Sequence, residues 1–274
     1  MRRIRVALLA ALALATCIGL APHAQAATAY SLYSYTMSNV SGSAVANGAA
    51  AYTAVPLQLA GAWSPSPNGV YFDGDRSTQQ SVAKAKPTSG YTLNVPEARA
   101  IGVAIRFTYT APATGTCFQD SPNLTQIGRF GNYVGQVKLQ LSNCGINKTQ
   151  VFAQCRIAGS KSPTSVWPRT STRALVNGTT YVVYCFEGVT SGGVRTFFLR
   201  AAPVGSALTM QQWTYNSPGA ITSSAYLSVA NKYPLPSQTS NTDQFVGDIA
   251  KVAYCSATTP GLVSSCLSTE IPNT

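Results

Sequence analysis

The chain has 274 residues, with 19 basic and 8 acidic side chains and a formal net charge of +11 at neutral pH. Its one histidine, His23, lies in an N-terminal segment that we expect to be cleaved. A mature chain without histidine excludes Ser-His-Asp and Cys-His catalysis, a histidine general base and histidine-ligated zinc.

The N-terminal segment has the features of a secretory signal peptide. Arginines near the N-terminus precede an apolar run over residues 6–20, and residues 24–26 (Ala-Gln-Ala) form a small-x-small cleavage pattern. The apolar run is shorter than the roughly 20 residues that a transmembrane helix needs. We therefore predict a signal peptide over residues 1–26, a secreted, extracellular protein and no transmembrane segment. Lipoprotein anchoring at Cys17 is the alternative, although the preceding Thr16 fits a lipid-attachment motif poorly.

The first part of the mature chain is expected to form strands joined by polar turns. A first strand followed by a loose loop is predicted within residues 28–52, which are rich in Ser, Ala, Gly and aromatics. Residues 63–69 hold two prolines and an Asn-Gly pair, which are typical of a turn. Residues 70–72 then begin a strand that runs into Asp73-Gly74-Asp75.

The clearest strand pattern lies at residues 101–109, where apolar residues alternate with smaller or polar ones. Such alternation is typical of a strand with one buried face. Residues 133–143 repeat it, and residues 151–157 are expected to pair with them as a hairpin. Residues 181–186 are apolar on both phases, as expected of a central strand, and the chain returns over residues 195–200.

The closing strand is predicted over residues 243–255, after a short one at 225–229. Phe245, Gly247 and Ile249 alternate at period two, whereas Val252 is out of step with them by one residue. Because side chains alternate between the two faces of a strand, this phase slip predicts a β-bulge.

No mature stretch of useful length shows a helical apolar period. Strands linked by Gly, Pro and Asn turns, without intervening helices, indicate an all-β fold. We predict one domain over residues 27–274, an antiparallel two-sheet β-sandwich (jelly roll) stabilised by disulfides.

Six cysteines remain after cleavage, and an even number behind a signal peptide indicates three disulfides. They are Cys117, Cys144, Cys155, Cys185, Cys255 and Cys266. Six cysteines permit 15 pairings. The favoured pairs are Cys255 with Cys266 and Cys155 with Cys185, on neighbouring strands, which leaves Cys117 with Cys144.

Four motifs in chain order resemble the concanavalin A-like lectin/glucanase superfamily, specifically its laminin G-like (LamG) jelly-roll domain. They are residues 69–74 (GVYFDG), the alternating strand at 101–109, residues 175–183 (LVNGTTYVV), and residues 245–249 (FVGDI), which is similar to a closing F-x-G-x-I. The resemblance covers residues 30–255 and implies the same sandwich.

The chain departs from that family at two places. Ala250 and Lys251 follow the closing Ile where acidic residues are usual, and Thr180 and Val182 replace an aromatic residue and a histidine. Glucanases of the superfamily carry E-x-D-x-x-E on one strand, and this motif is absent. We therefore predict that the protein is not an enzyme.

Two groups of residues are candidates for binding a sugar. Flat aromatic rings stack on sugars while nearby polar groups bind the hydroxyls. Trp167 with Arg169, and Trp213 with Tyr215 and Asn216, lie in segments that are expected to be loops. The alternative is that these rings pack loops against the sandwich, as we expect for Trp63.

Calcium is the one candidate cofactor, although none is required. Asp73 and Asp75 offer two carboxylates on one loop, and Asp243 or Asp248 could approach from the closing strand. The alternative is that Asp73-Gly74-Asp75 only forms a turn.

The predicted function is non-catalytic binding of an extracellular glycan or cell-surface polymer. The alternatives are a protein–protein adhesion or structural module without sugar specificity, with a surface protein as partner, and a degraded glucanase-like enzyme. The basic residues are scattered, which favours a soluble basic surface over a dedicated polyanion site. Export disfavours a nucleic-acid partner.

Overall fold

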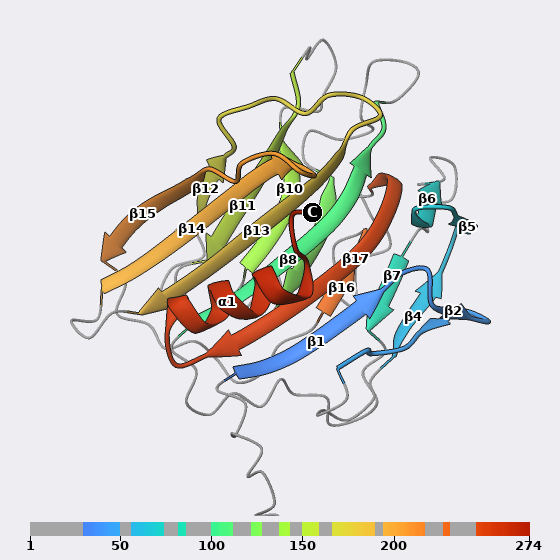
Figure 1. The fold of residues 1–274 in the computed structure, drawn as a ribbon, viewed down its shortest axis with the longest axis horizontal. Helices are drawn as coiled ribbons and strands as arrows, with labels where there is room; N and C mark the ends of the chain where they lie inside the picture. The colour runs from blue at the N-terminus through green and yellow to red at the C-terminus, as the bar shows by residue number, and fades with distance from the viewer. Residues whose placement is uncertain are drawn as a thin grey trace, which may run out of the picture.

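The computed structural model describes the following residues: 30–49, 56–73, 82–85, 100–111, 122–127, 137–142, 150–158, 166–189, 194–216, 227–230 and 245–274. Within these residues the chain forms strands β1 to β17 and the helix α1. The strands make two antiparallel sheets that pack face to face as a sandwich, which confirms the predicted fold class (Figure 1).

Sheet A contains the closing strand. Its order is β15 (Met210–Asn216), β14 (Val194–Pro203), β13 (Thr180–Val189), β8 (Ala100–Tyr109), β17 (Val246–Ala257), β6 (Gly69–Asp73) and β5 (Trp63–Ser66). Strand β1 (Tyr30–Thr36) also pairs with β17. The long central strands are therefore β13, β8 and β17, as the apolar patterns indicated.

Sheet B covers the other side of the core. Its order is β12 (Val166–Thr170), β11 (Phe152–Ala158), β10 (Val137–Ser142), β9 (Asn123–Ile127), β16 (Leu227–Val229), β7 (Val82–Ala85), β4 (Leu57–Ala60), β3 (Ala44–Val45) and β2 (Val40–Ser41). The predicted pairing of residues 133–143 with 151–157 is confirmed for the residues in β10 and β11.

The main core lies between the sheets and follows from strand alternation. On β8, the inward residues are the five that alternate in the sequence: Ile101, Val103, Ile105, Phe107 and Tyr109. All five are buried against inward residues of sheet B such as Leu139 on β10. Burying apolar area at about 25 cal/mol per Å² makes this interface the main source of stability.

Strand β17 contains the predicted bulge. Its register with β8 shifts between Ile249 and Lys251, which leaves Ala250 as the extra residue. On either side, Ile249 and Val252 are fully buried in the same core. The inserted residue brings the two out-of-phase halves of the strand onto one face.

Two of the predicted disulfides are confirmed. Cys255 and Cys266 join the end of β17 to α1, and Cys155 and Cys185 join β11 to β13. The second pair corrects one expectation, because its strands belong to different sheets and are not neighbours. Cys117 and Cys144 lie outside the described residues.

The sequence shows no helical apolar period, yet a helix, α1 (Pro260–Glu270), follows the last strand. Thr259 caps the helix, since its Oγ1 accepts from the backbone N–H of Leu262 at 3.3 Å, and Pro260 occupies the first turn. A capping Thr followed by Pro is a recognised helix-start signal. The short helix buries Val263, Cys266 and Leu267, a spacing too brief to register as a period.

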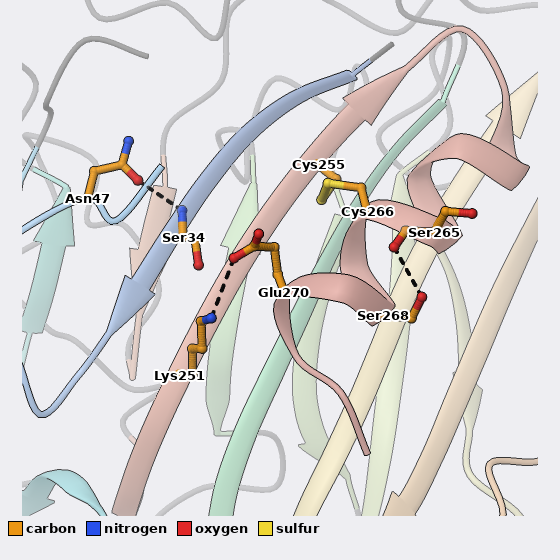
Figure 2. Close-up of a disulfide and its surroundings, with 8 residues drawn as sticks. All are labelled: Ser34, Asn47, Lys251, Cys255, Ser265, Cys266, Ser268 and Glu270. Carbon is orange, nitrogen blue, oxygen red and sulfur yellow. Dashed lines mark hydrogen bonds and ion pairs between the residues drawn. A yellow bond between two sulfur atoms is a disulfide. The ribbon is translucent and has the colours of Figure 1, made fainter. Parts of the chain in front are cut away.

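Helix α1 lies across the outward face of sheet A (Figure 1). Its three buried residues form a second core cluster with outward side chains of β8, β13 and β17, including Ala104, Tyr184 and Ala253. Figure 2 shows the Cys255–Cys266 disulfide between strand and helix. The described part of the chain holds no helix long and apolar enough to cross a membrane.

The segment expected to be a turn at residues 63–69 is largely strand. Ser66 pairs with Gly69, so only Pro67 and Asn68 form the turn between β5 and β6. Trp63 packs against the main core, as predicted. The loose loop expected before it contains the small strands β2 and β3.

Candidate functional site

The outward face of sheet B is polar. On β10, Val137, Leu139 and Leu141 point into the core, so the intervening residues lie on the opposite face of the strand. Those residues are Lys138 and Gln140, followed by Ser142 at the strand end.

The strand register aligns further polar residues with them across the sheet. Lys138 pairs with Arg156 on β11 and with Gln126 on β9, and Gln126 pairs in turn with Ser228 on β16. A second row joins Gln154, Gln140 and Asn123. We call this set the polar face: Asn123, Gln126, Lys138, Gln140, Ser142, Gln154, Arg156 and Ser228.

Most of the polar face is excluded from solvent. Lys138 is 2% exposed and Gln126 is 1% exposed, while Asn123 and Ser228 are fully buried. Lysine, asparagine and glutamine are mostly found at protein surfaces and are seldom buried without polar partners. Such a concentration of buried polar groups outside the apolar core is the most unusual feature of the described fold.

Several acceptors on the polar face are not used within the described residues. Gln140 Nε2 donates to Gln154 Oε1, which ties the second row together. Gln140 Oε1, Ser142 Oγ and Ser228 Oγ are buried and accept no hydrogen bond there. Buried polar atoms normally find partners, so these three oxygens are exceptions among the described residues.

The residues predicted to bind sugar lie elsewhere, and not in loops. Trp167 and Arg169 belong to β12, at the edge of sheet B, whereas Trp213, Tyr215 and Asn216 belong to β15, at the edge of sheet A. The two groups are therefore not brought together within one sheet.

Trp213 packs against the interior of the sandwich. Its ring stacks on Phe197 with centroids 5.1 Å apart, and it contacts the main core. This is the packing role that was predicted as the alternative to sugar binding. The polar face could not be recognised from the sequence, because its members come from four strands and only the register aligns them.

A cavity of about 380 Å³ opens at the C-terminal end of α1, on the outward face of sheet A. Its polar lining consists of Thr36, Ser38, Asn68, Arg106, Lys251 and Glu270. The charged groups bind one another or the backbone: Lys251 Nζ lies 3.4 Å from Glu270 Oε2 (Figure 2). Arg106 Nη2 donates to the carbonyl oxygens of Pro272 and Thr274. These contacts anchor the helix and the residues after it.

Two of the four aspartates predicted to bind calcium lie on the outward face of sheet A. Asp248 pairs with Tyr71, and Asp73 lies two residues further along the same strand, β6. Burial raises the pKa of the Tyr71 phenol, and the charges of Asp73 and Asp248 raise it further. Asp75 and Asp243 lie outside the described residues, and those described contain no cluster of three metal-ligating side chains. Calcium binding stays a prediction, checked by melting with and without a chelator.

Two of the three glutamates are engaged in ion pairs on opposite faces of sheet A. Glu187 Oε2 lies 3.2 Å from Arg195 Nη1, with both side chains fully buried on the inward face. Glu270 pairs with Lys251 on the outward face. A glycosidase needs two carboxylates about 5–9.5 Å apart facing one bond, and these two cannot meet in that way. Glu97 lies outside the described residues.

No family model and no curated protein matches the sequence. Among solved structures, peanut lectin with a 9mer peptide is similar at 9% identity and TM-score 0.47, over 83% of this chain and 97% of that one. An alginate lyase, Aly36B, with alginate tetrasaccharide is similar at 13% identity and TM-score 0.42, over 82% and 95%. The CBM2 module of an evolved Dit of Lactobacillus casei BL23 phage J-1 is similar at 11% identity and TM-score 0.43, over 82% and 96%.

Proposed function

We propose that the protein is a secreted, non-catalytic module that binds an extracellular glycan on the polar face of sheet B. The observation that carries the proposal is the alignment of amide, hydroxyl and cationic side chains from β11, β10, β9 and β16 on one face.

The side chains of the polar face suit a ligand rich in hydroxyl groups. Each Asn or Gln amide offers hydrogen-bond donors and an acceptor, and each hydroxyl can donate or accept a hydrogen bond. A sugar hydroxyl likewise donates and accepts, so paired amides such as Gln140 and Gln154 can bind it from two strands. Side chains on rigid strands hold such geometry better than side chains on loops.

The extent of the polar face favours an extended ligand. Its first row, from Arg156 to Ser228, crosses four adjacent strands. Neighbouring strands lie about 4.8 Å apart, so the row is about 14 Å long. The row is long enough for a stretch of polymer, and Arg156 is its only member that is more than 2% exposed.

A non-catalytic role is supported by the positions of the carboxylates. The strands of sheet B contain no aspartate or glutamate, so they supply no general acid or base of that kind. Glu187 and Glu270 are held in ion pairs on sheet A. The mature chain is also predicted to lack histidine.

The test is a polysaccharide panel with the oxidised mature chain and two matched variants. Gln140→Leu/Gln154→Leu removes the paired amides of the polar face, and Gln212→Leu changes an exposed amide on β15 of sheet A. We expect the double variant to bind its best polysaccharide at least about tenfold more weakly, because each lost hydrogen bond contributes about 1 kcal/mol. The control variant should bind as the native chain does.

Melting curves of both variants establish that they are folded. A panel on which the native chain binds no polysaccharide would overturn the proposal and favour the adhesion module. Release of sugar products by the native chain would overturn its non-catalytic part.

A further inference from the structure

We infer that the cavity at the C-terminal end of α1 binds one neutral sugar unit through its hydroxyl groups. This site is distinct from the polar face, since it lies on the outward face of sheet A, and it does not depend on the proposed function. The inference is carried by where the cavity lies, by the polar groups that line it and by the balance of their charges.

The cavity lies where the β-bulge of β17 meets other parts of the chain. Strand β1 pairs with β17 as far as Lys251, and β6 pairs with it from Ile249 onward, so one partner strand replaces the other at the bulge. Arg106 of β8, the turn between β5 and β6, and the end of α1 complete the lining. β-Bulges are frequent beside functional sites, because they change the direction in which a side chain points.

Backbone contacts hold the walls of the cavity in place. The N–H of Met37 donates to the carbonyl oxygen of Ala250 at 2.9 Å, which fixes the end of β1 against the bulge. A Cβ atom at Gly69 would lie 2.2 Å from the carbonyl oxygen of Ile249, so only glycine lets the turn before β6 approach the bulge so closely. The cavity is therefore built on paired strands and needs little rearrangement to bind a ligand.

Three uncharged polar side chains of the cavity are available to a ligand. They are Thr36 at the end of β1, Ser38 in the turn after it, and Asn68 in the turn between β5 and β6. Within the described part of the chain, no hydrogen bond engages any of these three side chains. Ser38 and Asn68 are exposed and Thr36 is partly buried, so a ligand in the cavity can reach them. Each of them can donate and accept hydrogen bonds.

The charged groups of the cavity already have partners. Lys251 Nζ lies 3.4 Å from Glu270 Oε2, and these side chains are 28% and 22% exposed (Figure 2). Arg106 Nη2 donates to the carbonyl oxygens of Pro272 and Thr274. A carboxylate ligand would have to compete with Glu270 for Lys251, and an ammonium ligand would have to compete with Lys251 for Glu270. A neutral ligand avoids both costs.

The ion pair can still bind hydroxyl groups, because it is only partly buried. The Lys251 ammonium has three N–H donors and directs one of them to Glu270, and a carboxylate has about four lone-pair sites. Hydrogen bonds to charged groups are shorter and roughly twice as strong as those between neutral groups. The pair thus offers donors and acceptors side by side for neighbouring hydroxyls of one sugar ring.

The size and lining of the cavity favour a single sugar unit. Its volume of about 380 Å³ is near the lower end of the roughly 300–1,000 Å³ usual for small-molecule sites. None of the described residues that line it is aromatic, so ring stacking does not contribute and hydrogen bonds must select the ligand. Pro67 and Pro272 supply apolar surface for the C–H groups of a sugar ring.

The experiment measures binding of monosaccharides to the oxidised mature chain. Methyl glycosides of glucose, galactose and mannose are compared with the corresponding uronates and amino sugars by saturation-transfer NMR titration. We expect at least one methyl glycoside to bind about fivefold more tightly than its acid and its amine, since only the neutral form leaves the partly exposed ion pair intact. Tightest binding of an acid or an amine would overturn the neutral ligand.

Matched variants locate the site. Ser38→Ala/Asn68→Ala removes two polar groups of the cavity and should lower that affinity by at least about tenfold, because two hydrogen bonds are lost. Asn39→Ala/Ser64→Ala removes the same kinds of side chain from exposed positions outside the cavity and should leave the affinity within about twofold. Melting curves establish that both variants fold, and Ser38→Ala alone serves if the first does not.

Glu270→Gln tests the role of charge. This change keeps the size of the side chain but leaves Lys251 without its carboxylate. The uronate should therefore bind to this variant at least as tightly as the methyl glycoside does. An unchanged order of affinities would contradict the assignment of charge balance as the basis of selection.

The outcomes also separate this site from the polar face. A native chain that binds none of the monosaccharides overturns the inference and leaves the polysaccharide proposal standing. An equal loss of monosaccharide binding in Gln140→Leu/Gln154→Leu assigns that binding to the polar face and overturns the cavity as its site. Monosaccharide binding without any polysaccharide binding overturns the proposed function alone.

Discussion

Cys155 of β11 and Cys185 of β13 face one another through the interior of the sandwich, with their Cα atoms 5.6 Å apart. Their disulfide joins sheet B to sheet A next to Lys138, whose carbonyl oxygen lies 3.9 Å from Cys185 Sγ. Strand β11, which carries Arg156 of the polar face, is therefore fixed against the opposite sheet. The stability of the fold and the shape of the proposed site should depend on the same covalent link.

Removing this disulfide should cost more stability than removing the other described one. Cys155 and Cys185 are 30 residues apart and Cys255 and Cys266 are 11 apart, and closing the longer loop restricts the unfolded chain more. Chain entropy predicts losses of about 3.6 and about 2.8 kcal/mol for the paired Cys→Ala variants. Urea unfolding of both checks this. The Cys155→Ala/Cys185→Ala variant also leaves cavities in the core, which lower its stability further. A smaller loss of stability for this variant than for Cys255→Ala/Cys266→Ala would therefore contradict the prediction.

Alkaline unfolding should report on Tyr254. The hydroxyl of this fully buried residue lies 2.6 Å from Thr125 Oγ1, and burial raises the pKa of the phenol well above its usual value of 10.0. Above pH 10 this tyrosine loses its proton in the unfolded chain and keeps it in the folded chain. Stability is therefore fully present below pH 10 and falls as the pH rises, by up to about 1.4 kcal/mol per pH unit from this group.

Tyr254→Phe should flatten that alkaline slope. At neutral pH it should lower the free energy of unfolding by about 1–2 kcal/mol, because the hydroxyl's contacts with Thr125 Oγ1 and the Ser228 carbonyl oxygen are lost. The measurement is the free energy of unfolding in urea between pH 8 and pH 12. Tyr71→Phe is the comparison: the pKa of its phenol is also raised, but the phenol lies on the outward face of sheet A and is only partly buried, so this variant should flatten the slope less than Tyr254→Phe does. Equal slopes for native and Tyr254→Phe chains would contradict the assignment.

Gly102 should be essential for seating α1. A Cβ atom there would lie 2.4 Å from Phe186 Cβ and 2.8 Å from Val263 Cγ1, so the helix or the strand would have to move. Gly102→Ala should lower the free energy of unfolding by about 1–3 kcal/mol or more. Gly261→Ala is the matched control within α1. Its Cβ would meet only Thr259 Oγ1, at 3.9 Å, so stability should hold or rise by up to about 1 kcal/mol.

Thermal melting with helix content followed by circular dichroism measures both glycine variants. A Gly102→Ala chain as stable as the native one would show that α1 can lift away from sheet A without loss.

Much of the fold could be predicted because strand alternation is a local signal. The inward residues of β8 and the bulge at Ala250 were both visible in the order of residues. Two out-of-phase halves of a strand can face the same core only if an extra residue is inserted between them. The positions of Ile249 and Val252 therefore predict the bulge from the sequence. Helix α1 was not predicted, because its three buried residues are too few to establish a helical period. Its one sequence signal is the capping Thr259 followed by Pro260.

The candidate site, unlike the strands, could be predicted only in part. That Lys138 points away from the core follows from its apolar neighbours, so the face on which it lies was determined by the amino-acid sequence alone. Its alignment with Arg156 and Gln126 was not, because strand order and register depend on contacts between residues far apart in the chain. The sequence by itself determined which side chains leave the core. Only the tertiary structure decided which of them meet, since backbone pairing sets neighbours across a sheet independently of distance along the chain.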